Sequence, residues 1–343
     1  MDYRRELYEL PGALRETLEK GGPEYDRVVR QTRWGDGPVY VVGSAGAYPA
    51  ALAAACAFEA LMGIPALART AEDFQACALS LLRPRSILLV IAPSGESAET
   101  LEVAHSAKLR GATVLALTGD SQAELSKLAD GVLLVHSGEA PADSLGVDIC
   151  RLTAAIYLGF AAGRALKRPN SHLRDLQEEF QKLPDHVEWG LTQISEAIRA
   201  FAAAVKGATR IHVAGGGFYY PASWHSASAL RKLTGIKARA WNALGPEIPQ
   251  GESREPGTIT VLLSGSRCRG KKNIHALAES EKRAGKTLLV ITDRNDLELS
   301  RCSALALLLP VLCEEVGSIL NLSVLDWVAC HAGRETHGAE PRR

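Results

Sequence analysis

The residues best suited to chemistry in this chain are a short run of small and polar side chains, Ser94-Gly95-Glu96-Ser97. They follow the apolar run "ILLVIAP" and precede a helical pattern, where a helix exposes unpaired N–H groups and the positive end of its dipole. Gly95 lets the backbone approach a ligand, and Ser94 and Ser97 add hydroxyl donors. The run therefore predicts a neutral phosphate cradle. The alternative is structural, with Ser94 as an N-cap and Ser97 as its weak capping-box partner.

A second turn of small residues strengthens the phosphate interpretation. The stretch "GSAGAYPA" places Gly43 and Ser44 directly after the strand-like run "VYVV". Pro49 suits the first turn of the helix that follows, because its missing N–H has no partner there. Two donor-rich turns at strand ends favour a bound phosphate over simple helix capping.

Comparison of the chain with itself shows that its pattern occurs twice. At an offset of 172 residues Gly43 falls on Gly215 and Ser94 on Ser266, and at an offset of 174 Thr118 falls on Thr292. In each copy short β-branched runs alternate with helical patterns, which is typical of parallel sheets covered by helices on both faces. We expect an α/β protein with two pseudo-twofold halves that are separated by a polar, helical linker.

A polar stripe distinguishes the second copy from the first. His225, Ser228 and Lys232 are spaced by three and four residues and so share one helix face. The matching positions of the first copy hold small residues, namely Ala53, Cys56 and Ala60. Lys232 could act as a base if its pKa were lowered, or it could form a Schiff base. The alternatives are a solvated helix lysine and a helix histidine that packs beside Trp224 at a domain interface.

The second serine turn, "SGSRCRGKKN", is basic where the first is acidic. Arg267, Arg269, Lys271 and Lys272 could grip a second phosphate or a carboxylate, or they could form an exposed turn balanced by nearby acids. Cys268 lies in this basic loop, so its thiolate could be stabilised. No base is paired with it in the sequence, so a catalytic role lacks a second group.

Composition limits the classes of protein that remain. The chain has 343 residues, a net charge of zero and seven scattered cysteines. The chain has no excess of basic residues, so its charge does not predict a nucleic-acid or membrane-surface partner. We expect no metal, because the His, Cys and carboxylate residues are not grouped at ligand spacing. We also expect no organic cofactor.

The run Gly215-Gly216-Gly217 follows a strand but lacks the Gly-x-Gly-x-x-Gly pattern, which disfavours a nucleotide-binding dehydrogenase. The N-terminus lacks a signal core and the apolar runs are broken, so we expect a cytoplasmic protein.

On these residues and motifs, the chain resembles the tandem SIS (sugar isomerase) domain family. The Ser-Gly-Glu-Ser loop matches that family's phosphosugar loop, and "EAPADSLG" resembles its next ligand loop, which puts Ser144 near the sugar. The lead-in is similar to that of the isomerase half of glucosamine-6-phosphate synthase, and the chain also resembles fructosamine-6-phosphate deglycases. The resemblance implies a five-stranded parallel sheet flanked by helices in each domain, and a homodimer. It implies a lead-in at 1–34, SIS domains at 35–168 and 207–334, a helical linker at 169–206 and a tail at 335–343.

The chain departs from the family pattern at several positions. Ala92 replaces the first serine of the loop, so one phosphate donor is missing. Lys232 stands where the resemblance implies the catalytic glutamate, and His225 stands at an upstream glutamate. Leu244 replaces the histidine of the family's His-Gly-Pro, although Glu247 follows and could supply a carboxylate. The family's lysine near the C-terminus has no clear match.

Two functions therefore remain open. The first is an enzyme that acts on a sugar 6-phosphate, either an aldose–ketose isomerase or an aminosugar-phosphate deaminase or deglycase. Its catalytic candidates are Lys232, His225 and Glu247, and its substrate would be held by Gly43, Ser44, Ser94, Gly95, Ser97 and Ser144. The alternative is a non-catalytic phosphosugar sensor or binding protein, because the catalytic glutamate and histidine are not retained.

Overall fold

The computed structural model describes residues 3–35, 37–138, 141, 144–167, 172–193, 195–245 and 255–333. The chain divides into two compact units. The N-terminal unit is Leu10–Pro184, and the C-terminal unit combines Met1–Glu9 with Asp185–Arg343. Helices α1 (Tyr3–Gln31) and α7 (His172–Thr192) each belong partly to both units. Each helix crosses the division next to a proline, Pro11 or Pro184, which lacks the N–H needed for the helical hydrogen bond.

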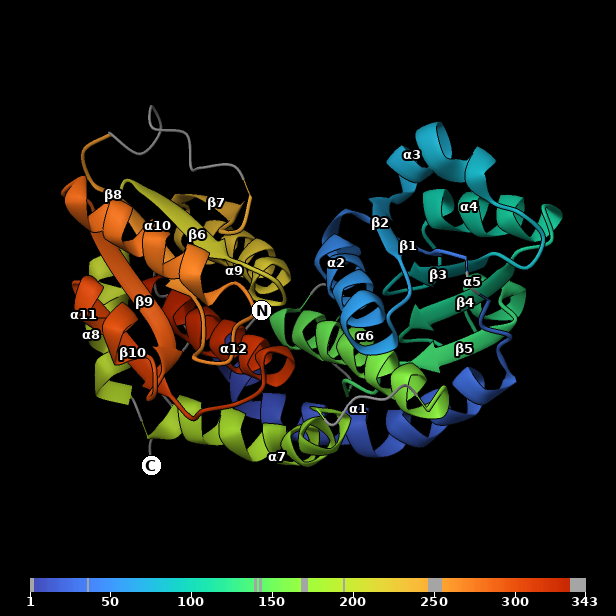
Figure 1. Ribbon diagram of the computed structural model, residues 1–343, viewed down its shortest axis with the longest axis horizontal. Coiled ribbons are helices and arrows are strands. Elements are labelled where there is room, and N and C mark those ends of the chain that lie inside the picture. The colour runs from blue at the N-terminus through green and yellow to red at the C-terminus, as the bar shows by residue number, and fades with distance from the viewer. Residues whose placement is uncertain are drawn as a thin grey trace. The chain divides into compact units, whose positions relative to one another are not determined.

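The N-terminal unit is built on one parallel five-stranded sheet in the order β2-β1-β3-β4-β5. Its strands are β1 (Val39–Gly43), β2 (Ala66–Thr70), β3 (Ile87–Ile91), β4 (Thr113–Thr118) and β5 (Gly131–Leu134). Its further helices are α2 (Tyr48–Ala57), α3 (Ala71–Asp73), α4 (Ala98–Leu109), α5 (Glu124–Leu128) and α6 (Leu145–Ala165). Helices α2 and α6 cover one face of the sheet, whereas α3, α4 and α5 lie on the other (Figure 1). The expected α/β fold is confirmed.

The central strands are apolar throughout because both of their faces are covered. Every residue of β1 and β3 is buried. On the α4 face Tyr40 and Val90 pack in one cluster with Phe74, which follows α3, and with Val103 of α4. Burying one such large apolar side chain contributes about 2–3 kcal/mol, so these contacts hold the sheet and its helices together.

Small residues let α2 and α6 approach closely on the opposite face. A Cβ added to Gly159 would lie 2.4 Å from Cβ of Ala57, and one added to Gly163 would lie 2.6 Å from the carbonyl oxygen of Leu61. No side chain fits at either glycine without displacing backbone or a neighbouring Cβ. The close contact of α6 with α2 and the turn that continues it therefore depends on glycine at both positions.

The C-terminal unit repeats this arrangement with a sheet in the order β10-β9-β8-β6-β7. Its strands are β6 (Arg210–Gly215), β7 (Lys237–Asn242), β8 (Thr258–Leu263), β9 (Thr287–Asp293) and β10 (Leu305–Leu309). Its helices are α8 (Ser195–Lys206), α9 (Tyr219–Thr234), α10 (Lys271–Arg283), α11 (Leu297–Cys302) and α12 (Glu314–Ala332). Helices α8, α9 and α12 lie on one face and α10 and α11 on the other (Figure 1).

The strand registers of the two sheets keep the offsets read from the sequence. Val39 pairs with Ile87 in one sheet, and Ile211 pairs with Ile259 in the other, so each residue of the second pair lies 172 positions after its counterpart in the first. Ile87 pairs with Thr113, and Ile259 pairs with Thr287, so the next strand moves by 174. A residue of one unit can therefore be matched to its counterpart in the other at these offsets.

The first turns of α1 pack against the last helix of the chain within the C-terminal unit. The rings of Tyr8 and Trp327 meet edge to face with their centroids 4.7 Å apart. Lys232 of α9 places its ammonium 5.1 Å from the ring centre of Tyr3. The C-terminal unit is thus assembled from both ends of the sequence.

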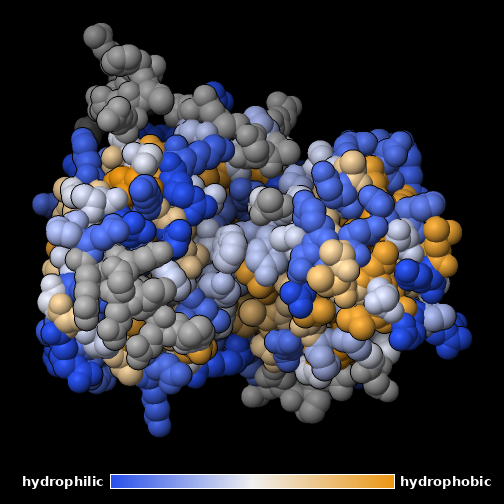
Figure 2. Space-filling model, turned by 90° about the horizontal axis from the view of Figure 1, so that it is seen from above, coloured by the Kyte–Doolittle hydropathy of each residue, from blue (hydrophilic) through white to orange (hydrophobic). Residues whose placement is uncertain are grey.

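One helix corrects the expectation that no stretch is long and apolar enough to cross a membrane. Helix α6 meets that test by length and composition, but 89% of its apolar window is buried inside the protein. Its apolar residues therefore belong to the core, as α2 and the sheet surround them. Figure 2 shows hydrophobic and hydrophilic side chains interspersed on the surface it views. The exposed apolar residues of the N-terminal unit include Leu81 and Leu109.

Candidate functional site

The order of the strands brings the two small-residue turns of the N-terminal unit to one edge. Strand β1 lies between β2 and β3, and Gly43 at its end is in register with Ile91 at the end of β3. The chain leaves β1 toward β2 and crosses back to β3, so the strand order reverses between β1 and β3. Ligands of open α/β sheets bind at such a reversal, beyond the carboxyl ends of the strands. Ser44 and Ser94 both follow this edge.

The backbone of residues 94–97, here called the first serine loop, is fixed by its neighbours. Gly95 has a φ of +69°, and a Cβ added there would lie 2.6 Å from Cβ of Ala123. Its carbonyl oxygen accepts a hydrogen bond of 3.1 Å from the N–H of Leu125. The Glu96 carboxylate accepts from the N–H of Glu124 at 2.9 Å. The loop thus needs glycine at position 95 and is anchored to the start of α5.

The start of α4 is left open by the serines that precede it. Helix α4 begins at Ala98, with Ser97 at the N-cap position, and within the described chain Ser97 makes no side-chain cap bond. Its hydroxyl instead donates to Glu99 at 2.7 Å, while the hydroxyl of Ser94 accepts from the N–H of Glu96 at 3.3 Å. That bond to Ser97 lowers the pKa of Glu99. The structural alternative, in which Ser94 caps the helix, is therefore wrong.

The remaining predicted binding residues lie in different surroundings. Ser44 is partly exposed in an extended conformation, and a Cβ added to Gly43 would lie 2.9 Å from the carbonyl of Ala47. Ser144 is fully buried, and its hydroxyl caps α6 by accepting from the N–H of Val147 at 3.2 Å. The structure thus gives Ser144 a capping role, and its contact with a sugar stays a prediction.

The matching residues 264–269, here called the second serine loop, are occupied by the chain's own acids. Asp293 accepts from both the N–H and the hydroxyl of Ser266, at 2.6 and 2.9 Å. The guanidinium of Arg269 binds Glu314 at 3.3 Å and Glu315 at 2.8 Å. Of the two interpretations of this basic turn, the geometry favours the one in which nearby acids balance it.

The suggestion that the basic loop stabilises the Cys268 thiolate is wrong. Burial, together with the carboxylate of Glu314, raises the pKa of Cys268 to about 12. The thiol points at that carboxylate, with Sγ 3.7 Å from Oε1. The Arg269 charge favours the thiolate but is outweighed, so Cys268 is a protonated, buried thiol.

The two predicted catalytic residues that the structure describes, His225 and Lys232, contact different partners. His225 is buried, and its Nε2 lies 2.7 Å from Oδ2 of Asp326 on α12. Lys232 is exposed and lies over the ring of Tyr3. Glu247 lies outside the described residues. Asp326 was missed by the sequence analysis, and its position opposite His225 could not be inferred from spacing because the two helices are far apart in the chain.

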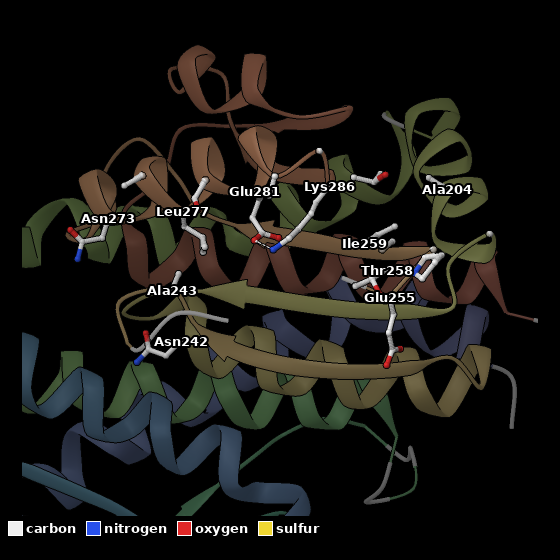
Figure 3. Close-up of a pocket in the computed structure, with 18 of the residues that line it drawn as sticks. Ala204, Asn242, Ala243, Glu255, Thr258, Ile259, Asn273, Leu277, Glu281 and Lys286 are labelled. Carbon is white, nitrogen blue, oxygen red and sulfur yellow. Dashed lines mark hydrogen bonds and ion pairs between the residues drawn. The ribbon is translucent and has the colours of Figure 1, made fainter. Parts of the chain in front are cut away.

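The C-terminal unit also has a cavity of about 1080 Å³ that the sequence did not indicate. It lies between α10 and the sheet, and in it Glu281 binds Lys286 at 2.6 Å and accepts from the hydroxyl of Thr260 at 2.7 Å (Figure 3). Gly245 and Glu255 line it, and the residues between them are not described. Among the described residues, none that lines the cavity belongs to either serine loop.

A family model covers part of the chain. Residues 36–166 match the family model of the SIS domain, so the N-terminal unit contains a SIS domain. That match falls within the N-terminal unit, which carries the open serine loop.

Two curated relatives are similar to this chain over nearly its whole length. The chain is 26% identical over 331 residues to a glutamine–fructose-6-phosphate aminotransferase (isomerizing) of Thermococcus kodakarensis, covering 95% of this chain and 54% of the relative. The enzyme of the same name from Pyrococcus horikoshii is 22% identical over 329 residues, covering 95% of this chain and 54% of the relative. The chain thus spans about half the length of the curated relatives it matches.

Solved structures share the fold over nearly the whole chain. The C-terminal domain of glucosamine-fructose-6-phosphate aminotransferase from Francisella tularensis has a TM-score of 0.83 at 17% identity, covering 97% of this chain and 95% of that one. Tagatose-6-phosphate ketose/aldose isomerase from Escherichia coli has a TM-score of 0.78 at 15% identity, covering 97% and 92%. Glucosamine-6-phosphate deaminase from Thermotoga maritima has a TM-score of 0.72 at 16% identity, covering 97% and 94%.

Proposed function

We propose that the N-terminal unit binds the phosphate group of a sugar phosphate at the first serine loop. The observation that carries this proposal is the uncapped start of α4, where Ser97 leaves the first helical N–H groups to other partners. The hydroxyls of Ser44 and Ser94 add donors at the same sheet edge, and Gly43 and Gly95 keep the backbone accessible. A dianionic phosphate suits such a donor set because the helix dipole favours negative charge there.

We propose further that the reaction is an aldose–ketose isomerisation, or the deamination or deglycation of an aminosugar phosphate. The similar proteins include isomerising aminotransferases, a ketose/aldose isomerase and a deaminase, which supports this class of substrate. Proton transfer between neighbouring carbons needs a base, and Lys232, His225 and Glu247 are the candidates on this chain. We keep a cytoplasmic homodimer without a nucleic-acid or membrane partner as part of the proposal, on the family resemblance and the balanced charge of the sequence. We retain 35–168 and 207–334 as its two domains.

A non-catalytic phosphosugar sensor is the second candidate function. It is favoured by the state of the two described catalytic candidates: His225 is buried against Asp326, and the ammonium of Lys232 lies over Tyr3. Both groups are thus engaged with other residues of the C-terminal unit. A sensor needs only the phosphate cradle and a sugar pocket.

Calorimetry with fructose-6-phosphate and glucosamine-6-phosphate tests the binding proposal. We expect saturable binding that Ser94→Ala weakens, while Ser80→Ala, at an exposed serine of the same unit, leaves it unchanged. Equal binding by all three proteins would refute the proposal. Unphosphorylated fructose is the ligand control, and it should bind far more weakly because it lacks the dianion.

Product analysis separates the enzyme from the sensor. The folded protein is incubated with the same sugar phosphates and a fructosamine-6-phosphate, and isomer formation and ammonia release are followed for hours. We expect turnover that Lys232→Ala reduces without changing the affinity for the sugar phosphate. Binding with no product from any of these substrates would favour the sensor.

A further inference from the structure

A carboxylate of the protein itself lies among the donors of the second serine loop. Glu314 is 2% exposed at the start of α12, and its Oε1 accepts from the N–H of Phe218 at 3.3 Å. Its Oε2 accepts from the N–H of Arg269 at 3.1 Å and from that guanidinium at 3.3 Å. Two backbone amides from different loops and one cation therefore surround a single buried anion.

The backbone beside Glu314 is shaped to receive it. Gly217 has a φ of +56°, and a Cβ added there would lie 2.1 Å from Oε1 of Glu314. The carboxylate thus touches the turn after β6 at a position that only glycine leaves open. This turn and the second serine loop follow β6 and β8, the pair of strands between which the order reverses in this sheet. The carboxylate lies where an open α/β sheet holds its ligand.

The corresponding positions of the N-terminal unit hold residues too small to do this. At the offsets fixed by the strand registers, the residues that fill the second loop are Tyr219, Asp293 and Glu314, and their counterparts are Ala47, Gly119 and Ala140. The buried ring of Tyr219 adds bulk next to the two carboxylates, since a Cβ added to Gly265 would lie 2.5 Å from its hydroxyl. By sequence, one unit therefore has a tyrosine and two acids where the other has two alanines and a glycine, of which Ala140 lies outside the described residues.

We infer that the C-terminal unit contains a second anion cradle, and that its occupant is the side-chain carboxylate of Glu314. The cradle is built from the N–H groups of Phe218 and Arg269, the Arg269 guanidinium and the open face of Gly217. It accepts a small oxyanion of phosphate or carboxylate chemistry once Glu314 is removed. With Glu314 in place it is closed to outside ligands, so external phosphate binds this chain through the first serine loop alone. This last consequence rests on the proposed function.

The charges around Glu314 explain why the carboxylate stays in the cradle. Burial and the neighbouring Glu315 raise the pKa of Glu314, whereas the Arg269 charge and the two amide bonds hold it down. Arg269 also binds Glu315, so one guanidinium serves two buried acids. Removing only the Glu314 carboxylate leaves the N–H donors of Phe218 and Arg269 without this acceptor and breaks half of the Arg269 pairing. Such a loss is costly, because the remaining polar groups are left unsatisfied.

Anion rescue of Glu314→Ala tests the inference. The protein carries Ser94→Ala throughout, so that phosphate binding at the first serine loop is weakened, and the probe is inorganic phosphate compared with sodium chloride of equal ionic strength. We expect Glu314→Ala to lower the Tm by roughly 5–10 °C, given 2–4 °C per kcal/mol for a unit of this size. Millimolar phosphate should restore much of this loss in a saturable manner, and calorimetry should show about one new phosphate site per chain.

Two further variants make each result decisive. Glu298→Ala removes an exposed carboxylate, 74% accessible, from the same unit and should neither lose stability nor gain a site. Glu314→Gln keeps the cradle filled and should show no rescue by phosphate. If Glu314→Ala does not fold alone, refolding in phosphate should recover it. Rescue by chloride, equal rescue of the Gln variant, or no gain of phosphate binding by Glu314→Ala would overturn the inference. None of these outcomes depends on whether the wild type binds a sugar phosphate.

Discussion

The two serine loops have the same place in two sheets of the same strand order, yet one is open and the other is filled. In the first loop, Ser97 stands before α4 without capping it, and the neighbouring acid Glu99 is exposed. In the second, buried Asp293 and Glu314 accept the hydrogen bonds of the loop and of the adjoining turn. The backbone arrangement alone therefore does not make a ligand site.

The difference shows what a binding loop gives up. An open loop leaves donors to water until a ligand arrives, so it contributes less to the stability of its own unit. A filled loop uses the same donors to tie a strand end to a helix, here β8 and β6 to α12. The proposed phosphate binding in one unit and the stabilising contacts in the other thus depend on the same local geometry with different side chains around it.

The largest expected effect is on the alkylation rate of Cys268 in the second serine loop. Cys268 touches Glu314 and has a pKa of about 12, so at pH 8 only about one molecule in 10⁴ carries the reactive thiolate. We expect iodoacetamide to label Cys268 at least about 100-fold more slowly than exposed Cys77, since alkylation follows the thiolate fraction and access. Peptide mass spectrometry after timed labelling measures both rates. Comparable rates would mean that the second loop is not filled as described.

A strong effect is expected from a methyl group in the open loop. Gly95→Ala places a Cβ 2.6 Å from Ala123 and forces a side chain into a left-handed φ of +69°, so we expect a loss of about 2–3 kcal/mol in unfolding free energy. Sugar-phosphate binding should fall at least about 30-fold, because the displaced loop no longer aligns its donors. Gly63→Ala is the control, with a φ of +67° but nothing within 4 Å of the added Cβ. It should cost about 1 kcal/mol and leave binding intact.

The matching serines Ser94 and Ser266 should affect different properties, the first ligand affinity and the second stability. Ser94→Ala removes one donor to a charged phosphate, for which we expect about a tenfold weaker affinity and little change in Tm. Ser266→Ala removes a hydroxyl that Asp293 accepts from at 2.9 Å, so we expect unchanged affinity and about 1–2 kcal/mol less stability. Calorimetry measures the sugar-phosphate affinity of each variant, and thermal unfolding measures its stability. If Ser266→Ala weakened binding as much as Ser94→Ala, the distinction between the loops would fail.

A smaller effect is expected at the acid beside the open loop. Glu99 accepts the Ser97 hydroxyl at 2.7 Å and adds a negative charge near the proposed phosphate position. Glu99→Gln should therefore tighten sugar-phosphate binding about two- to fivefold at low salt, and the gain should shrink at high salt because exposed charges are screened. Glu102→Gln changes an exposed acid farther along the same helix and should have no effect. Weaker binding by Glu99→Gln would show that Glu99 supports the ligand rather than opposes it.

Much of the fold could be predicted because its signals are local. Runs such as "ILLVI" are continuous and apolar, as buried parallel strands require, and the offsets between Gly43 and Gly215 or Thr118 and Thr292 reappear in the strand registers. Helix α6 meets the length and composition of a membrane span, and only its packing, with 89% of the apolar window buried, shows that its apolar residues belong to the core.

The candidate site was less predictable because its decisive contacts are long-range. The composition of "SGSRCRG" shows that Arg269 needs an anion, but not whether Glu314 or a ligand supplies it. The exchange of Ala140 for Glu314 is visible at an offset of 174, yet only the packing of α12 shows where the carboxylate points. The same holds for His225, whose partner Asp326 lies 101 residues away.

The contact between Tyr8 and Trp327 has a consequence for how the protein is made. A ribosome releases Tyr8 before the sheet of the N-terminal unit and Trp327 only near the end of α12, while that sheet is complete once β5 has emerged. The first turns of α1 must therefore wait, without their aromatic partner, until translation has passed more than 300 further residues. Synthesis imposes an order on the two units that refolding of the finished chain does not, so nascent and refolded molecules should reach the same structure by different routes.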